Sequence, residues 1–176
     1  RTLHKTQDVL EIGSGSGQHA LYFSEHLPHL TWQATDTETY LNNLQLNILE
    51  SKQNIPKPFL LDVSTFNEPP PKKYDAVFSA NTLHIMSWEE VTQMFNLVEE
   101  VTKQIATLYI YGPFYYEGKC SSPSNQEFDK WLKQRNPESG IRNFEDVNEL
   151  AIQRGFQLKE DNLMPANNQL LVWVKS

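Results

Sequence analysis

The sequence predicts a single domain over residues 1–176, formed by an open α/β sheet that is mostly parallel and has helices on both faces. Residues 8–17 read as a strand ending in a glycine-rich turn, strand and helix patterns then alternate, and two final strands form a hairpin. The 176 residues suffice for one domain with a substantial core. Open α/β sheets bind ligands beyond the carboxyl ends of their strands, so we look for a site there.

The individual elements follow from hydrophobic periodicity, in which short apolar runs indicate strands and apolar residues three and four apart indicate helices. We expect strands at residues 8–12, 30–35, 59–63, 74–80, 106–111, 156–164 and 169–174. We expect helices at residues 18–26, 38–51, 87–101, 124–132 and 144–154. Two of these helices begin with the S-x-x-E pattern of a capping box, from Ser87 to Glu90 and from Ser124 to Glu127.

Charge and cysteine content narrow the class of partner. The net charge is -7 and the basic residues are scattered, whereas nucleic-acid-binding proteins usually concentrate them, so we expect a small-molecule partner and no nucleic acid. No apolar run approaches the ~18 residues of a membrane helix, and no signal peptide is recognisable. Cys120 is the single cysteine and allows no intrachain disulfide, which favours a cytoplasmic location. These features leave the oligomeric state open.

The turn after the first strand is the strongest indication of function. A dinucleotide fingerprint would have its third glycine at position 18, which is Gln18 here. The pattern Glu-x-Gly-x-Gly-x-Gly, from Glu11 through Gly13 and Gly15 to Gly17, instead resembles the first motif of class I S-adenosylmethionine-dependent methyltransferases. Such glycines let a ligand approach the backbone. The resemblance implies S-adenosylmethionine as cofactor, with its ammonium held by Glu11 directly or through water.

The order of elements resembles the same class. Five β-α units followed by a hairpin match its Rossmann-like, seven-stranded sheet, with strand order 3-2-1-4-5-7-6 and strand seven antiparallel. The resemblance implies a cofactor site at Glu11, Gly13, Gly15, Gly17, Asp36 and Asp62. We add Ser14, His19, Val63, Ala80 and Asn81 as further candidates for cofactor binding. It implies no metal site.

One aspartate follows the second expected strand, and another lies at the end of the third. Asp36 stands 19 residues after Gly17, a separation at which an acid accepts hydrogen bonds from ribose hydroxyls. Its alternative role is the N-cap of the following helix. In this fold Asp62 would accept a hydrogen bond from the adenine amino group, with Val63 as an apolar edge. The alternative for Asp62 is a turn residue without a ligand.

The methyl acceptor is expected beyond the fourth and fifth strands. His84 is a candidate base for a hydroxyl or amine nucleophile, or it orders the loop before the next helix. Tyr111 is a second catalytic candidate, in an aromatic stretch that would either line the acceptor pocket or pack as a lid. Candidates for contacts with the acceptor are Tyr115, Asn125 and Asn167.

Several segments together resemble one methyltransferase-like family described as a domain of unknown function, bacterial with animal relatives. They are residues 10–20, 78–88, 111–114, 139–142 and 164–168. The resemblance covers essentially the whole chain and implies the fold and the cofactor site, but no acceptor. It also implies a segment ahead of residue 1, which we expect this chain to lack.

The leading hypothesis is an enzyme that transfers a methyl group from S-adenosylmethionine to an oxygen or nitrogen of a small molecule. The alternative is a non-catalytic S-adenosylmethionine-binding module that serves a partner protein. A third hypothesis, a nucleotide-dependent oxidoreductase, is disfavoured by Gln18 and by the final hairpin.

Overall fold

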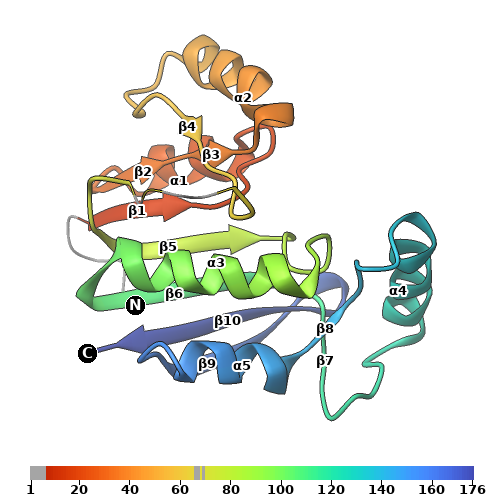
Figure 1. Cartoon of the computed structure of the whole chain (residues 1–176). Helices are drawn as coiled ribbons and strands as arrows, with labels where there is room; N and C mark the ends of the chain where they lie inside the picture. The colour runs from red at the N-terminus through yellow and green to blue at the C-terminus, as the bar shows by residue number, and fades with distance from the viewer. Residues whose placement is uncertain (1–6, 66–67, 69) are drawn as a thin grey trace.

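The computed structural model describes residues 7–65, 68 and 70–176 as a twisted sheet flanked by helices (Figure 1). Within these residues the main sheet has six strands in the order β2-β1-β5-β6-β10-β9. They are β1 (Gln7–Glu11), β2 (Leu30–Gln33), β5 (Tyr74–Ala80), β6 (Thr102–Gly112), β9 (Gln157–Met164) and β10 (Asn168–Lys175). β2, β1, β5 and β6 run parallel, and β10 is antiparallel to both β6 and β9, as the expected final hairpin requires.

The expectation of seven strands in one sheet is corrected at the sheet edge. The second expected strand is interrupted at Ala34, and its end, β3 (Thr35–Asp36), pairs with the short β4 (Phe59–Leu60) in a separate two-stranded sheet. The residues that follow β1 no longer pair with β3 as a strand. Ser14 instead donates its N–H to Thr35 O and accepts from Thr35 N through its hydroxyl. β4 ends early because Asp62 begins a turn, with its side chain accepting from Ser64 N.

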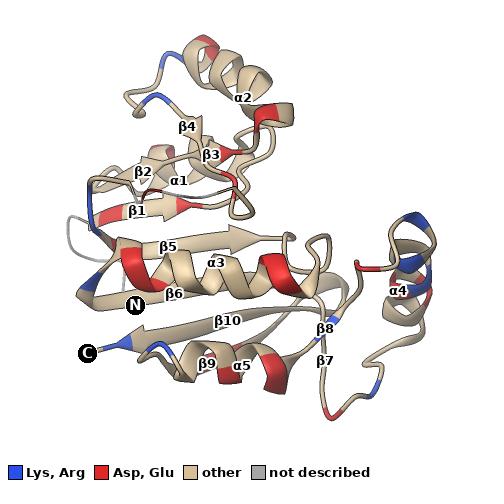
Figure 2. Cartoon of the chain, viewed as in Figure 1, with Lys and Arg blue, Asp and Glu red and all other residues tan. Residues whose placement is uncertain are grey.

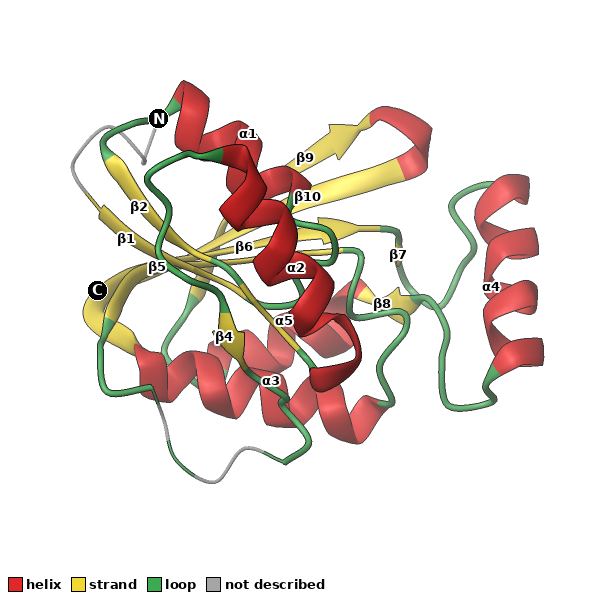
Figure 3. Cartoon of the chain, turned by 90° about the horizontal axis from the view of Figure 1, so that it is seen from above, coloured by secondary structure: helices red, strands yellow, loops and turns green. Residues whose placement is uncertain are grey.

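Helices cover both faces of the sheet, as expected (Figure 3). α1 (Gln18–His26) and α2 (Glu38–Ser51) pack on one face around Trp32. α3 (Trp88–Val101) and α5 (Phe144–Ile152) pack on the other around Phe95 and Trp173. The apolar side of α3 is completely buried at Val91, Met94, Phe95, Val98 and Val101, which confirms the helical periodicity of this segment.

The two expected capping boxes have different outcomes. At α3, Ser87 accepts from Glu90 N and the Glu90 side chain accepts from Ser87 N, so the capping box is confirmed. The box at Ser124 is wrong, because α4 (Pro123–Arg135) has Ser122, two residues earlier, as its N-cap. Pro123 suits the first helical position because its fixed φ fits a helix and its missing N–H would have no partner there.

α4 stands apart from the sheet, between the short strands β7 (Phe114–Tyr115) and β8 (Arg142–Asn143), which pair with each other (Figure 1). Lysine and arginine residues are spread over several elements rather than gathered on one (Figure 2). Within residues 7–65, 68 and 70–176, no helix has the length and apolar character needed to cross a bilayer.

Candidate functional site

The turn after β1 brings the backbone close to the loop that follows β5. Gly13 has φ 73°, and a Cβ built there would lie 2.6 Å from Cγ2 of Thr82. Gly15 has φ 59° with open space beside it. Positive φ is costly for residues with a side chain, so both positions require glycine to form this turn.

Gly17 and Ser14 have structural roles in the same turn. A Cβ on Gly17 would lie 3.1 Å from Cδ1 of Leu44, so this glycine allows α1 and α2 to pack closely. Ser14 is buried and joins the turn to Thr35 through a side-chain and a backbone hydrogen bond of 3.0 and 2.8 Å. Both residues therefore stabilise the turn through contacts with α2 and Thr35, outside the lining of the cavity described below.

Asp36 lies at the end of β3 with both carboxylate oxygens engaged by the backbone. Oδ2 accepts from Gly15 N and Oδ1 from Thr37 N, each at 2.7 Å. The N-cap of α2 is Thr37, so the alternative role of Asp36 as N-cap is wrong. Each oxygen has further lone pairs, and the residue lines a cavity.

Asp62 follows β4 and stabilises a turn. Its Oδ1 accepts from the backbone N–H of Ser64 at 2.9 Å and from the Ser64 hydroxyl at 2.6 Å. Asp62 also lines the same cavity, beside the buried Val63. The turn role is therefore observed, and it leaves the second carboxylate oxygen available to a ligand.

The end of β5 contributes residues to the same cavity. Asn81 has φ 57°, and its N–H donates to Tyr111 O at 2.8 Å. Asn81 is exposed and lines the cavity together with Ala80. The structure thus places the ends of β1, β3, β4 and β5 around one space, as the rule for open α/β sheets predicts.

That space is a cavity of about 380 Å³ at the carboxyl ends of the strands. Seven of the expected cofactor residues line it: Gly13, Gly15, Asp36, Asp62, Val63, Ala80 and Asn81. The sequence analysis missed eight others: Ile12, Thr37, Tyr40, Leu61, Thr82, Ile85, Met86 and Glu90. Tyr40 and Ile85 are large apolar residues that are 58% and 60% exposed, but only the folded chain shows this exposure.

Glu11 and His19 lie outside the lining of this cavity. Glu11 is completely buried, and its Oε1 accepts from the Trp32 indole at 3.0 Å. Its Oε2 lies 3.4 Å from Nδ1 of His19 and has no hydrogen-bond donor among the described residues. A buried carboxylate oxygen without a donor is costly, so a ligand cation or water is the expected partner.

His84 lies just after β5 and is 6% exposed. Burial lowers its pKa from 6.5 to about 4, and the positive charge of Arg142 adds to this effect. No described residue forms a hydrogen bond with its ring nitrogens, and its ring contacts Phe128 edge-to-face. A Cβ on Gly112 would lie 3.8 Å from both His84 Nδ1 and Asn81 Oδ1, so the open side of Gly112 faces both side chains.

The other acceptor-side candidates form a network away from the cavity lining. The Tyr115 hydroxyl donates to Asn125 O at 3.4 Å, and Asn125 Nδ2 donates to Asn167 O at 3.2 Å. Burial raises the pKa of Tyr115, and Asp129 adds to the shift, so this phenol stays protonated. Tyr111 pairs with Ala80 at the adjoining strand ends. The structure therefore brings Tyr115, Asn125 and Asn167 together, where they attach α4 to the hairpin.

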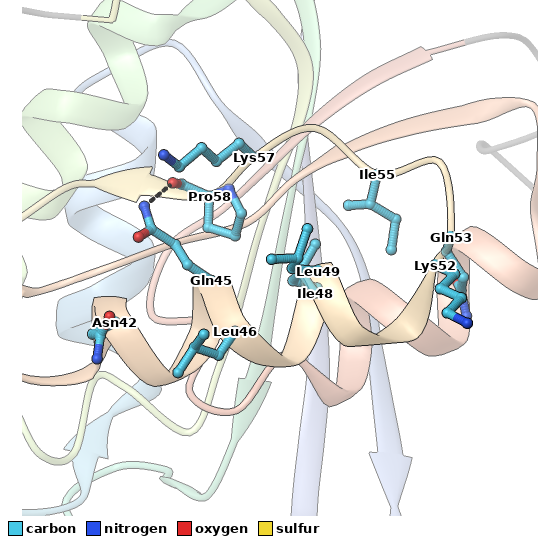
Figure 4. Close-up of a pocket in the computed structure, with 10 residues that line it drawn as sticks. All are labelled: Asn42, Gln45, Leu46, Ile48, Leu49, Lys52, Gln53, Ile55, Lys57 and Pro58. Carbon is cyan, nitrogen blue, oxygen red and sulfur yellow. Dashed lines mark hydrogen bonds between the residues drawn. The ribbon is translucent and has the colours of Figure 1, made fainter.

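A second cavity of about 520 Å³ lies on the outer side of α2 (Figure 4). Gln45 donates to Pro58 O at 2.8 Å, and Leu49 and Lys52 also line the cavity. It lies away from the carboxyl ends of the main strands and contains none of the expected site residues. Its position therefore does not fit the cofactor site.

The fold is that of class I S-adenosylmethionine-dependent methyltransferases. Similar solved structures include that of the S-adenosylmethionine-dependent methyltransferase SibL (17% identity, TM-score 0.79, 98% of this chain and 51% of that chain). They also include an O-methyltransferase family protein from Burkholderia thailandensis (14% identity, TM-score 0.82, 99% of this chain and 52% of that chain). A third is an O-methyltransferase family 2 protein from Planctomyces limnophilus in complex with apigenin (13% identity, TM-score 0.83, 100% of this chain and 53% of that chain). The chain thus spans about half the length of these proteins.

The chain belongs to the family described as "Protein of unknown function (DUF938)", which matches residues 1–175. This confirms the expected resemblance to a methyltransferase-like family without an assigned function. At 13–17% identity, the solved structures support the fold, while the reaction is a separate question.

Proposed function

We propose that this chain binds S-adenosylmethionine in the cavity at the carboxyl ends of β1, β3, β4 and β5, and transfers its methyl group to an oxygen or nitrogen of a small molecule. The observation that carries this proposal is the convergence of Gly13, Asp36, Asp62 and Asn81 on one cavity. These residues come from four strand ends and combine glycine backbone, carboxylates and an amide. Such a set suits a ligand with hydroxyl, amino and cationic groups.

The donors and acceptors of the cavity fit the parts of the cofactor. Asp36 has lone pairs for ribose hydroxyls, and it is fixed by the N–H groups of Gly15 and Thr37. Asp62 would accept from the adenine amino group, while the exposed apolar surfaces of Tyr40 and Ile85 would cover the base. Oε2 of Glu11, which has no hydrogen-bond donor among the described residues, supplies a negative charge near the glycine turn for the methionyl ammonium, bridged by water.

On the acceptor side, His84 offers a neutral imidazole. Because its pKa is about 4, the ring is uncharged at neutral pH and can accept a hydrogen bond from a hydroxyl or amine. A positively charged imidazole beside a sulfonium would be repelled, so a low pKa suits this position. When bound, S-adenosylmethionine supplies a methyl group already activated by its sulfonium charge. The residues of the site therefore need chiefly to orient the acceptor, and orientation is a large part of catalysis.

The chain's acidity and its scattered basic residues favour a small-molecule acceptor. We expect the protein to act in the cytoplasm, because its single cysteine, Cys120, is an exposed free thiol. The apigenin complex of the Planctomyces protein makes phenolic hydroxyls reasonable first acceptors to test.

The proposal is tested by calorimetric titration of the chain with S-adenosylhomocysteine, followed by incubation with methyl-labelled S-adenosylmethionine and a metabolite extract. We expect micromolar binding and a labelled small molecule. Binding without any labelled product would favour the alternative, a non-catalytic module for a partner protein. Absence of binding, with NADH bound instead, would overturn the proposal in favour of an oxidoreductase.

A further inference from the structure

The loop after β5 is held by a segment more than fifty residues away in the chain. This loop, residues 83–86, forms one wall of the cavity through Ile85 and Met86, and it also carries His84. Its own hydrogen bonds are few: the N–H groups of Ile85 and Met86 both donate to Thr82 O, at 3.1 and 3.2 Å. A loop with so little internal bonding needs external contacts to hold one conformation.

Those contacts come from residues 139–142, one of the segments that link the chain to its family. Ser139 Oγ donates to Ile85 O at 2.7 Å, and Gly140 N donates to His84 O at 2.9 Å. Arg142 donates from Nε to Leu83 O at 3.3 Å and from Nη2 to Met86 O. Four successive carbonyls of the loop are thus each bound by this segment, which we call the 139–142 clamp.

The clamp is itself fixed to α4. Asp129 is 7% exposed, and it accepts from Ile141 N at 2.8 Å and from Lys133 Nζ at 2.8 Å. A Cβ on Gly140 would lie 3.0 Å from Asp129 Oδ1 and 2.9 Å from Lys133 Cε. A larger residue at position 140 would therefore require the side chains of Lys133 and Asp129 to shift.

Arg142 also connects the clamp to the strands. As part of β8 it pairs with Phe114 in β7, directly after β6, and its guanidinium lies 5.9 Å from the centroid of the Trp88 ring. It is about half buried by its surroundings and bonds Glu138 O at 2.8 Å in addition to the loop carbonyls. An arginine that satisfies three carbonyls uses its planar donors in a way that a lysine cannot reproduce.

We propose that the 139–142 clamp is a positioning element of the methyl-transfer site, in which Ser139 and Arg142 hold residues 83–86 so that Ile85 and Met86 close on the cofactor while His84 faces the acceptor. This inference rests on the proposed function. It also means that α4, through Asp129, contributes to the cofactor cavity without touching it.

The test compares Arg142→Met with Arg154→Met. Arg154 makes the same kinds of bonds, to Leu150 O and to the Asn96 amide at 2.6–3.1 Å, but it joins α5 to α3 away from the cavity. We expect both variants to lower the melting temperature to a similar extent. Only Arg142→Met should weaken S-adenosylhomocysteine binding, by at least tenfold, with partial recovery in Arg142→Lys. Unchanged binding in folded Arg142→Met would overturn the proposal.

Ser139→Ala is the milder variant if Arg142→Met does not fold, and Ser51→Ala is its control, because Ser51 Oγ also donates to a carbonyl, that of Ile48, at the far end of α2. Amide hydrogen exchange of Ile85 and Met86 in the ligand-free chain gives a readout that does not depend on the cofactor. We expect these amides to exchange at least tenfold faster in Ser139→Ala and at an unchanged rate in Ser51→Ala. If the unaltered chain fails to bind S-adenosylhomocysteine, the proposed function fails, whereas unchanged exchange in Ser139→Ala refutes the clamp.

Discussion

Oδ2 of Asp36 accepts the backbone N–H of Gly15 at 2.7 Å, which ties the end of β3 to the glycine turn after β1. The second oxygen, Oδ1, accepts from Thr37 N, also at 2.7 Å. This carboxylate therefore shapes the turn, and its negative charge is held at the edge of the cavity. A residue in that position would order the site before any ligand arrives, which lowers the entropic cost of binding.

We predict that Asp36→Asn weakens S-adenosylhomocysteine binding by at least tenfold. The amide keeps one acceptor oxygen but loses the negative charge, and hydrogen bonds to charged groups contribute roughly 1.5–3 kcal/mol. Calorimetric titration measures the change.

Asp75→Asn is the matched control for that variant. Asp75 also accepts a backbone N–H, that of Asp8 at 2.8 Å, but it lies near the start of β5, at the other end of the strand from the cavity. Its replacement should leave binding unchanged. An equal loss in both variants would show that Asp36 acts only through the fold.

We predict that Gly13→Ala abolishes ligand binding. The new Cβ would meet Thr82 at 2.6 Å, and φ 73° disfavours alanine by about 1–2 kcal/mol. Gly118→Ala is the control, because Gly118 has a similar φ of 69° and nothing within 4 Å of its Cβ position. Both variants should unfold more easily in urea, but only Gly13→Ala should lose S-adenosylhomocysteine binding. Retained binding in Gly13→Ala would contradict the close approach of Thr82 to the turn.

We predict that His84 makes the protein less stable in acid. Its pKa is about 4 in the folded chain, against 6.5 in an unfolded one, so the unfolded state binds more protons between these values. The free energy of unfolding should therefore rise with pH from about 4 to 6.5, by up to about 3 kcal/mol, and His84 should add no slope above pH 6.5.

Urea unfolding of the unaltered chain and of His84→Gln between pH 4.5 and 7.5 measures this effect. The variant removes the titrating group, so its stability should change less over this range. His26, which is exposed and bonds Tyr22 O, provides the control variant His26→Gln. The same pH slope in His84→Gln as in the unaltered chain would refute a buried neutral imidazole.

Local patterns explain which features the sequence predicted well. The helix at 38–51 and the final hairpin follow from periodicity, which depends on residues near one another in the chain. The site at the strand ends follows from the parallel arrangement of β1 and β5, because this arrangement places their carboxyl ends side by side.

Features that depend on distant partners could not be predicted in this way. The division of the expected second strand at Ala34 depends on Ser14 replacing β1 as the neighbour of Thr35. The exposure of Ile85 and the binding of its carbonyl by Ser139 depend on a contact across 54 residues. No periodicity encodes such a pairing, although the segment at 139–142 was already visible as a motif without a role.

The last prediction concerns Glu11, a buried acidic residue whose role is either in ligand binding or in folding alone. Its Oε2 lacks a hydrogen-bond donor among the described residues, while Oε1 accepts from the indole of Trp32 at 3.0 Å. Glu11→Gln removes the charge but keeps an oxygen for the indole, so we expect the free energy of unfolding to remain within about 1 kcal/mol or to increase. Trp32→Phe would instead remove the only donor to Oε1, so that neither carboxylate oxygen accepts a hydrogen bond from the described residues. We expect this variant to lower the free energy of unfolding by about 1–3 kcal/mol, in addition to the effect of the smaller ring on packing. If Glu11 pairs with the methionyl ammonium, Glu11→Gln should weaken S-adenosylhomocysteine binding at least tenfold in a chain that is no less stable. A large loss of stability with unchanged binding would instead assign the buried carboxylate to folding alone.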